Sequence, residues 1–250
     1  MSNCNPASCP MEKSSLQEMS EDRRLLINQP YRELVGALLY LSQSTRFDIS
    51  YVVNILSRYV HNPTVACWNT AKRVLRYLKG TRNYRLVFRR KTESCPTLQG
   101  FVDADYGSDP LDRKSFTGFI FEVFGCPVSW VTRKQSSVAT SSSDAEYVAL
   151  SIAACEGLWL KFLLEDIGIN CDNFVLFEDN ISAIFISSGS KNPRRTKHID
   201  VRYHHVKDLV EKKVINIKHI SSSLQRADLL TKPLNGHLLK DLCKLCNIYI

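Results

Sequence analysis

The chain has 250 residues, of which 44% are hydrophobic and 23% charged, an ordinary composition for a globular protein with a buried core. No apolar run reaches the roughly 18 residues that span a bilayer, and the start lacks a signal-peptide pattern. These features argue against a secreted or membrane protein, so we expect an intracellular, soluble one. The formal net charge of +8 favours a polyanionic partner.

The N-terminal part of the chain carries the whole excess of positive charge. Residues 1–95 contain 15 Lys and Arg against 7 Asp and Glu, whereas residues 96–250 contain 18 against 18. Residues 1–30, interrupted by Pro6, Pro10 and Pro30, are typical of an irregular leader with at most one short helix. In residues 31–94, apolar side chains recur at helical spacing, which predicts a small all-helical module of about three helices.

The third predicted helix has four basic residues away from its apolar stripe: Lys72, Arg73, Arg76 and Lys79. A solvated helix face is the usual explanation of such a run, but solvated faces normally mix the two signs of charge. Here no acid occurs between Asp48 and Glu93. We therefore predict contact between this helix and a phosphate backbone, with the solvated face as the alternative.

A change of periodicity follows a short linker at residues 92–97. Three β-rich runs, separated by turn residues, predict an antiparallel start: Leu98 to Tyr106, Ser115 to Phe124 and Cys126 to Thr132. Next come a long helix ending near Gly168, an apolar strand at 174–177, two helices, a strand at 214–220 and terminal helices. This order predicts an α/β domain in residues 95–234, a mixed sheet with flanking helices, and a helical tail in residues 235–250.

Asp103 is the acid that stands out by its position alone. It lies in the middle of a predicted strand, on the face that alternation gives to Phe101 and Asp105, although Asp is depleted in strands. A functional role explains this position better than structure does. Asp105 lies nearer the turn, and its role is left open.

Three other acids have an ordinary explanation beside the functional one. Glu146 opens the long helix, where Ser143 and Glu146 could form a capping box. Asp179 follows a short strand and could cap the next helix, but the C-terminal end of a central strand is also where α/β sheets build sites. Asp228, at the head of a late helix, carries little signal alone.

Five phrases in the second part of the chain resemble a known family. They look like the ribonuclease H domain of copia-type LTR retrotransposon Pol polyproteins: FVDADYGSDPLDRKSFTGFIF, SWVTRKQSSVATSSSDAEYVAL, FEDNISAI, RTKHIDVRYHHVKDLV and QRADLLTKPL. The stretches YRELVGALLYLSQSTRFDISYVVNILSRY and AKRVLRYLKGT similarly resemble the thumb and connection that follow the polymerase palm of this family. The resemblance implies a ribonuclease H-like five-stranded sheet preceded by a thumb/connection-like module.

The resemblance also implies a reaction and a site. The metal-binding and catalytic acids of the family fall on Asp103, Glu146, Asp179 and Asp228. They would hold two Mg²⁺ ions, with Mn²⁺ as a substitute, and cleave the RNA strand of an RNA–DNA hybrid without a small-molecule cofactor. A separation above about 10 Å between the first three acids would rule out a shared two-metal site. A cytoplasmic virus-like particle, or the nucleus, is the implied location.

Two further sets of polar residues have both a functional and a structural explanation. Short polar side chains around the start of the long helix could hold phosphate or ribose hydroxyls, with capping as the alternative: Lys134, Gln135, Ser141, Ser142 and Ser143. His198 and His205 could belong to a zinc site, although ordinary helix histidines explain them better. Asp200 is the reserve candidate if Asp228 proves remote.

Competing functions remain open. The chain has no Tyr-x-Asp-Asp polymerase motif, so we do not expect it to copy nucleic acid, and the remaining Pol polymerase domain is a candidate partner. Departures from the family pattern, Phe47 and Ser221 in place of Pro, touch no predicted metal ligand. The first hypothesis is an active hybrid-specific ribonuclease. The alternatives are a catalytically silent hybrid-binding or assembly fragment, and an integrase-like nuclease, which the sequence favours least.

Overall fold

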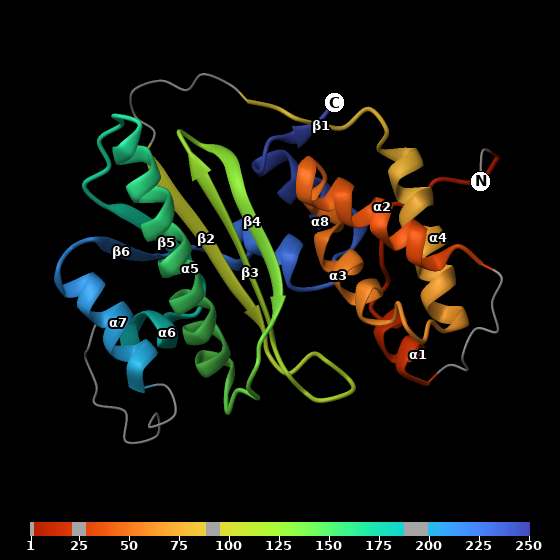
Figure 1. Ribbon diagram of the computed structural model, residues 1–250, viewed down its shortest axis with the longest axis horizontal. Coiled ribbons are helices and arrows are strands. Elements are labelled where there is room, and N and C mark those ends of the chain that lie inside the picture. The colour runs from red at the N-terminus through yellow and green to blue at the C-terminus, as the bar shows by residue number, and fades with distance from the viewer. Residues whose placement is uncertain (1–2, 22–28, 89–95, 188–199) are drawn as a thin grey trace.

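A mixed five-stranded sheet forms the centre of the computed structural model, which describes residues 3–21, 29–88, 96–187 and 200–250 (Figure 1). The strand order is β4-β3-β2-β5-β6; β2, β3 and β4 run antiparallel, whereas β5 and β6 run parallel to β2. The strands are β2 (Leu98–Asp105), β3 (Phe116–Val123), β4 (Cys126–Lys134), β5 (Phe174–Glu178) and β6 (Ile215–His219). The predicted sheet is therefore confirmed, with β2 in its middle.

One face of the sheet is covered by a long helix. The apolar residues of α5 (Ser142–Asp166) pack against the side chains of β2, β3 and β5 that alternation places on this face, among them Val102, Phe121 and Leu176. Helices α6 (Ile181–Ser187) and α7 (Asp200–Glu211) pack beside α5. Among the described helices, α5 alone is long and apolar enough to cross a membrane, but 56% of its most apolar window is buried, as expected of a core helix.

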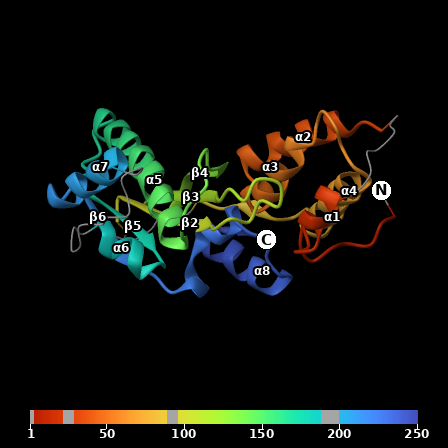
Figure 2. The same cartoon turned by 90° about the horizontal axis from the view of Figure 1, so that it is seen from below.

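The opposite face of the sheet packs on the rest of the chain. Its core combines Phe116 and Ile120 of β3 with Leu229 and Leu230 of the 3₁₀ helix η4 (Arg226–Leu230) and with the helical segments. These segments are α1 (Ser15–Glu21), α2 (Tyr31–Ser44), η1 (Phe47–Ile49), α3 (Ser50–Arg58), α4 (Val65–Gly80) and α8 (Gly236–Leu245). The 3₁₀ helix η3 (Ser222–Leu224) precedes η4 and has no buried residue. Figure 2 shows α5 and α8 on opposite sides of the sheet, so two apolar cores enclose it.

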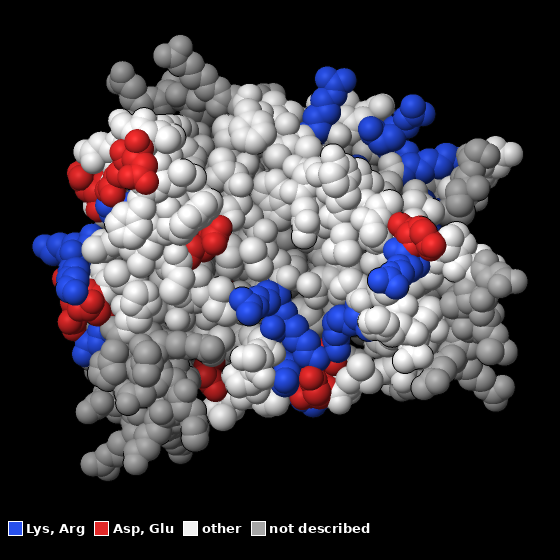
Figure 3. Space-filling model, in the orientation of Figure 1, with Lys and Arg blue, Asp and Glu red and all other residues white. Residues whose placement is uncertain are grey.

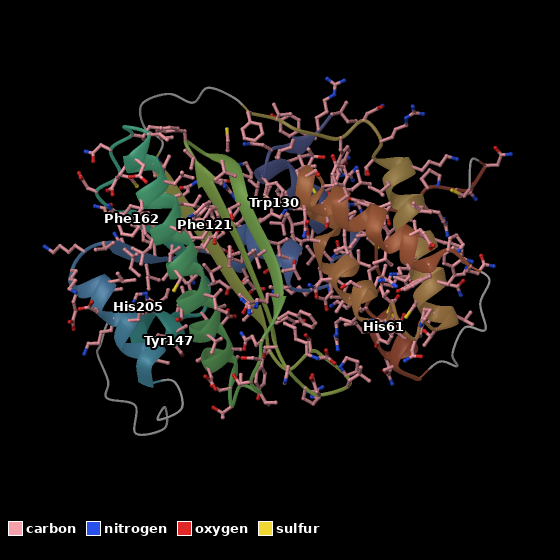
Figure 4. All side chains as sticks on the ribbon, in the orientation of Figure 1. His61, Phe121, Trp130, Tyr147, Phe162 and His205 are labelled. Carbon is pink, nitrogen blue, oxygen red and sulfur yellow. The ribbon has the colours of Figure 1, made fainter. Side chains whose placement is uncertain are left out.

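The helical segments are joined to the sheet along β4. The Trp130 ring lies between the strand and the helices (Figure 4), 4.8 Å from the Phe47 ring, and its indole N–H donates to the carbonyl of Ser42 at 2.9 Å. The Asn54 amide donates to the carbonyl of Thr132 at 3.1 Å, and Arg58 forms an ion pair with buried Asp109. Buried polar contacts of this kind fix the helices in one position on the sheet.

The structure differs from the expected elements in two places. A two-residue strand pair joins β1 (Arg85–Leu86) to β7 (Ile248–Tyr249), whereas only helices were expected at the C-terminus. Two residues are too few to show a period of alternation, and the pair forms because the packing of α8 brings the chain end to β1. The segment around Asp228, expected to open a helix, is a five-residue 3₁₀ helix, which ends shortly before Pro233, a residue without a backbone N–H.

Candidate metal centre

Three of the four predicted acids meet at one edge of the sheet. Asp103 lies near the end of β2, Asp179 directly follows β5, and Glu146 lies on the first turns of α5. Each offers a carboxylate oxygen, and these three oxygens lie within 4.8 Å of one another. Asp105, which the sequence left open, is not a member of this group. The 4.8 Å separation is well inside the limit set above for a shared two-metal site.

The capping role that competed for Glu146 belongs to other residues. Ser141 is the N-cap of α5, and its hydroxyl accepts from the backbone N–H of Asp144 at 3.2 Å. The Asp144 carboxylate accepts in turn from the backbone N–H of Thr140 at 2.7 Å. The alternative in which Ser143 and Glu146 form a capping box is therefore wrong, because the helix starts earlier. Glu146 is 6% exposed, with Oε2 buried and without a hydrogen-bond partner.

Asp179 is likewise not needed to cap a helix. The side-chain oxygen of Asn180 accepts from the backbone N–H of Ala183 at 3.1 Å, which makes Asn180 the residue that caps the start of α6. The strand ends at Glu178, so the parallel alignment of β2 and β5 brings Asp179 beside Asp103. The neighbouring Asn thus leaves the Asp179 carboxylate available as a ligand.

Asp228 reaches the centre from η4, on the side of Asp103 that faces away from α5. The Gln225 side chain fixes η4 to the sheet, since its amide donates to the carbonyl of Val102 at 2.7 Å. The Thr231 hydroxyl donates to Asp103 Oδ2. Lys232 Nζ lies 2.9 Å from Asp228 Oδ1 and 3.6 Å from Asp103 Oδ2. Asp228 is therefore linked to the other acids through Asp103 and Lys232.

Sequence reasoning missed three residues of this centre: Glu178, Thr231 and Lys232. Glu178 is fully buried on the α5 face of the sheet, where one carboxylate oxygen accepts from the backbone N–H of Asn180 at 3.0 Å and the other has no partner. An acid at the end of an apolar strand was a visible signal for Glu178. The spacing of Lys232, four residues after Asp228, was a signal for an ion pair.

Burial raises the pKa of four carboxyls of the centre, those of Asp103, Glu146, Glu178 and Asp228. Burial, together with the negative charges of Glu178, Asp103 and Asp179, raises the pKa of Glu146 to about 11. Burial and the charge of Asp103 raise the pKa of Asp228 to about 7, and burial also raises the pKa of Asp103. Burial alone would lower the pKa of Lys232, but the carboxylates of Asp103 and Asp228 raise it. The centre thus contains more negative charge than its own cation neutralises.

The carboxylate ligands of the centre are of the kind that bind hard divalent cations. Mg²⁺ and Mn²⁺ take carboxylate oxygens, and Glu146, which has an unpartnered oxygen, belongs to the group of three converging ligands. Asp103, Glu146 and Asp179 would hold one ion, and Asp103 with Asp228 would hold a second. Among the residues that the structure describes, no other set of three His, Cys, Asp or Glu ligands converges in this way.

The raised pKa values predict how the stability of the metal-free protein depends on pH. An Asp in the unfolded chain has a pKa of about 3.9, so a folded-state pKa of about 7 for Asp228 means that the folded protein binds this proton more tightly. This contribution to the stability of the folded protein is complete below the pKa that Asp has in the unfolded chain. It is lost as the pH rises through the pKa of Asp228 in the folded protein. Glu146 extends the same trend to higher pH.

We therefore expect the melting temperature in EDTA to fall by roughly 4–8 °C between about pH 5 and about pH 8. Saturating Mg²⁺ should remove most of this slope, because the ion neutralises the deprotonated carboxylates. Differential scanning calorimetry at several pH values, with and without Mg²⁺, measures both effects. A metal-free protein that becomes more stable over this range would contradict the electrostatics of the centre.

The residues predicted to contact substrate around the start of α5 differ in burial and in the partners that they already have. Gln135 is buried, and its amide donates to Thr117 Oγ1 at 3.0 Å and to the carbonyl of Ala145 at 2.9 Å, so it positions the start of α5. Lys134 Nζ forms ion pairs with Asp109 at 2.7 Å and Asp112 at 2.8 Å. Figure 3, which shows the molecule from the same side as Figure 1, has a group of basic side chains with acidic neighbours at its lower middle. Ser141 and Ser142 are exposed and Ser143 is partly exposed beside the centre, and substrate contact by them stays a prediction.

The basic residues of α4 have partners within the chain. Arg76 donates to the carbonyl of Asn5 at 2.7 Å, Lys79 donates to the carbonyl of Cys4 at 2.8 Å, and Arg73 forms an ion pair with Glu12 at 2.7 Å. Lys72 Nζ lies 5.9 Å from the centroid of the Trp68 ring. Three of the four residues thus bind the leader, and α4 lies at the end of the molecule opposite to α7 (Figure 1).

Phosphate contact by α4 stays a prediction, which the salt dependence of hybrid binding tests. If Arg73 and Arg76 contact phosphates, the double variant Arg73→Ala, Arg76→Ala will lower the slope of log K against log salt by about two. Fluorescence anisotropy with a labelled hybrid at several salt concentrations measures the slope. An unchanged slope with a lower melting temperature would mean that these residues only anchor the leader.

The alternative zinc site gains no support from the described residues. His198 lies outside them, and Asp200 begins α7 with its side chain outside the described part. His205 Nε2 lies 3.8 Å from Cys155 Sγ, which supplies two potential ligands rather than the four of a structural zinc site. Asp228 is part of the centre, so the reserve role given to Asp200 is not needed.

The chain is similar to long polyproteins of transposons. It is 37% identical over 238 residues to the retrovirus-related Pol polyprotein from transposon TNT 1-94 of Nicotiana tabacum, which covers 93% of this chain and 18% of that protein. It is 36% identical over 236 residues to the Pol polyprotein from transposon RE2 of Arabidopsis thaliana, covering 94% of this chain and 16% of that protein. The chain thus spans less than a fifth of the length of these relatives.

The chain resembles LC11-RNase H1 isolated from compost, with a TM-score of 0.43, 14% sequence identity and coverage of 58% of this chain and 96% of that one. No protein-family model matches the chain.

Proposed function

Because this chain belongs to the retrovirus-related Pol polyproteins of copia-type transposons, we propose that it hydrolyses the RNA strand of RNA–DNA hybrids with Mg²⁺ as cofactor. The observation that carries the proposal is the convergence of Asp103, Glu146 and Asp179 within 4.8 Å. A cluster of buried, incompletely partnered carboxylates costs stability, and such clusters are typical of functional sites.

The chain's own residues have distinct tasks in this proposal. Asp103 would serve both ions, Glu146 and Asp179 would complete one shell, and Asp228 would complete the other. Bound Mg²⁺ would supply Lewis-acid stabilisation of the attacking water and of the leaving 3′ oxygen. Thr231, by donating to Asp103, orients the carboxylate that both shells share.

The start of α5 is suited to hold the RNA strand beside the acids. The exposed side chains of Ser141 and Ser142 and the first N–H groups of the helix offer donors for a phosphate or a ribose hydroxyl. A 2′-hydroxyl distinguishes RNA from DNA, so donors at this position favour cleavage of the RNA strand. Glu146 lies one turn further along the same helix.

Incubation of the purified chain with end-labelled RNA–DNA hybrid and Mg²⁺ tests the proposal. We expect fragments with 5′-phosphate and 3′-hydroxyl ends from the RNA strand, no cleavage of a DNA duplex of the same sequence, and no products in EDTA. Hybrid binding without any cleavage would support the alternative, a catalytically silent hybrid-binding or polyprotein-assembly fragment. The small share of its relatives that the chain spans makes that alternative worth testing.

A further inference from the structure

We propose that Lys232 is a built-in counter-ion that occupies the cation position between Asp103 and Asp228 and must leave it before a metal ion can bind there. The inference rests on the proposed function, because it assigns the order in which the two ions of that centre bind. The first ion would enter among Asp103, Glu146 and Asp179, whereas the second would compete with the Lys232 ammonium.

The geometry places the ammonium where a cation would bind. Lys232 Nζ lies 2.9 Å from Asp228 Oδ1 and 3.6 Å from Asp103 Oδ2, so it bridges the two acids that would share the second ion. Asp103 also belongs to the group of three converging carboxylates. The ion pairs of Lys232 are therefore with the two acids on the η4 side of the centre.

The backbone holds Lys232 in this place. Its N–H donates to the carbonyl of Asp228 at 3.4 Å, and the preceding residue, Thr231, is bound to Asp103 through its hydroxyl. Gln225 ties the start of the same segment to β2. The lysine is thus part of a fixed element, unlike a surface lysine whose backbone and side chain both move freely.

An ammonium and a divalent ion compete for these carboxylates. Both are attracted by the same negative charges, and two positive charges a few ångströms apart repel each other strongly in a partly buried site. The Lys232 side chain is 34% exposed, whereas those of Asp103 and Asp228 are 3% and 6% exposed. The lysine therefore has a path to solvent that the acids lack, and displacement moves the ammonium rather than the carboxylates.

Chemical labelling of the wild-type protein tests the displacement directly. Acylation of lysines with a limiting amount of an N-hydroxysuccinimide ester, followed by peptide mass spectrometry, reports how readily each side chain loses its proton to the free amine and meets the reagent. We expect the labelling rate of Lys232 to rise at least about threefold as Mn²⁺ is added, since the pairing that protects it is lost. Lys244, in an exposed ion pair with Asp241 on α8, is the internal control and should not change.

Metal binding by a Lys232→Met variant supplies the second test. Isothermal titration with Mn²⁺ should show one tighter and one weaker ion in the wild type, and the weaker ion should bind at least about tenfold tighter in the variant. The melting temperature of the variant should be lowered in EDTA and restored by Mn²⁺, whereas loss of a purely structural lysine would lower it equally in both conditions. Lys244→Met is the matched control.

The outcomes separate this inference from the proposed function. If Mn²⁺ binds but the labelling of Lys232 is unchanged, and the weaker ion binds no better in Lys232→Met, the counter-ion role is overturned and the metal centre stands. If no Mn²⁺ binds to the wild type at all, both are overturned. The labelling experiment needs no variant, so poor folding of Lys232→Met would not prevent a decision.

Discussion

Asp103→Asn will reduce cleavage of the RNA strand of a hybrid by at least about 10³-fold. Asp103 is the acid that both ion positions share, because one of its oxygens belongs to the group with Glu146 and Asp179. Its Oδ2 accepts a hydrogen bond from the Thr231 hydroxyl and lies 3.6 Å from Lys232 Nζ. The amide of Asn keeps the size of the side chain but offers a weaker ligand and no charge. Single-turnover cleavage of a labelled hybrid over a range of Mg²⁺ concentrations measures the loss.

The fold of this variant should remain intact. The Asp103 carboxyl is buried and its pKa is raised, so a neutral amide removes an unfavourable buried charge in the metal-free protein. We expect an equal or higher melting temperature in EDTA and unchanged hybrid binding. Asp172→Asn, at an exposed position before β5, is the matched control and should cleave as the wild type does. Full activity of Asp103→Asn would rule out the centre as the site of cleavage.

The sequence predicted most of the fold because its long elements have clear periods. Helix α5 and strands β2, β3 and β4 depend on local spacing, and the structure confirms these elements. Strands β1 and β7 could not be predicted, since each has two residues and exists only through its partner. The burial of Met11 and Met19 in the helical core likewise depends on contacts distant in sequence.

In the candidate site, too, some residues could be recognised from local sequence and others could not. Asp103 was recognisable alone because a charged residue is out of place in the middle of a strand. Glu146 and Asp179 were each one or two residues from an equally good cap, and local sequence does not decide which of two neighbours caps a helix. The structure decides it, since Ser141 with Asp144 caps α5 and Asn180 caps α6. The spacing of Lys232 and Asp228 signalled an ion pair, but its connection to Asp103 was not visible, because Asp103 lies far from Lys232 in the sequence.

Gly118→Ala will lower cleavage by at least about tenfold, through the position of η4 rather than through any ligand. Gly118 pairs with Asp103 across β2 and β3, and the absence of a side chain lets η4 lie directly against the sheet. A Cβ at this position would lie 2.6 Å from Thr231 Cγ2 and 2.8 Å from Leu230 Cβ. The methyl group must therefore push η4 outward, and Thr231 and Lys232 move away from Asp103.

Stability should fall together with activity, by about 1–3 kcal/mol, because the extra methyl group overpacks a filled core. Gly36→Ala is the matched control: Gly36 lies within α2 and an added Cβ there meets nothing within 4 Å. That variant should be as active as the wild type and more stable by about 0.5–1 kcal/mol, since Ala is the better helix former. Urea unfolding and single-turnover cleavage measure both variants. If Gly118→Ala loses stability but keeps full activity at a temperature where it is folded, the placement of η4 against Asp103 is not required for catalysis.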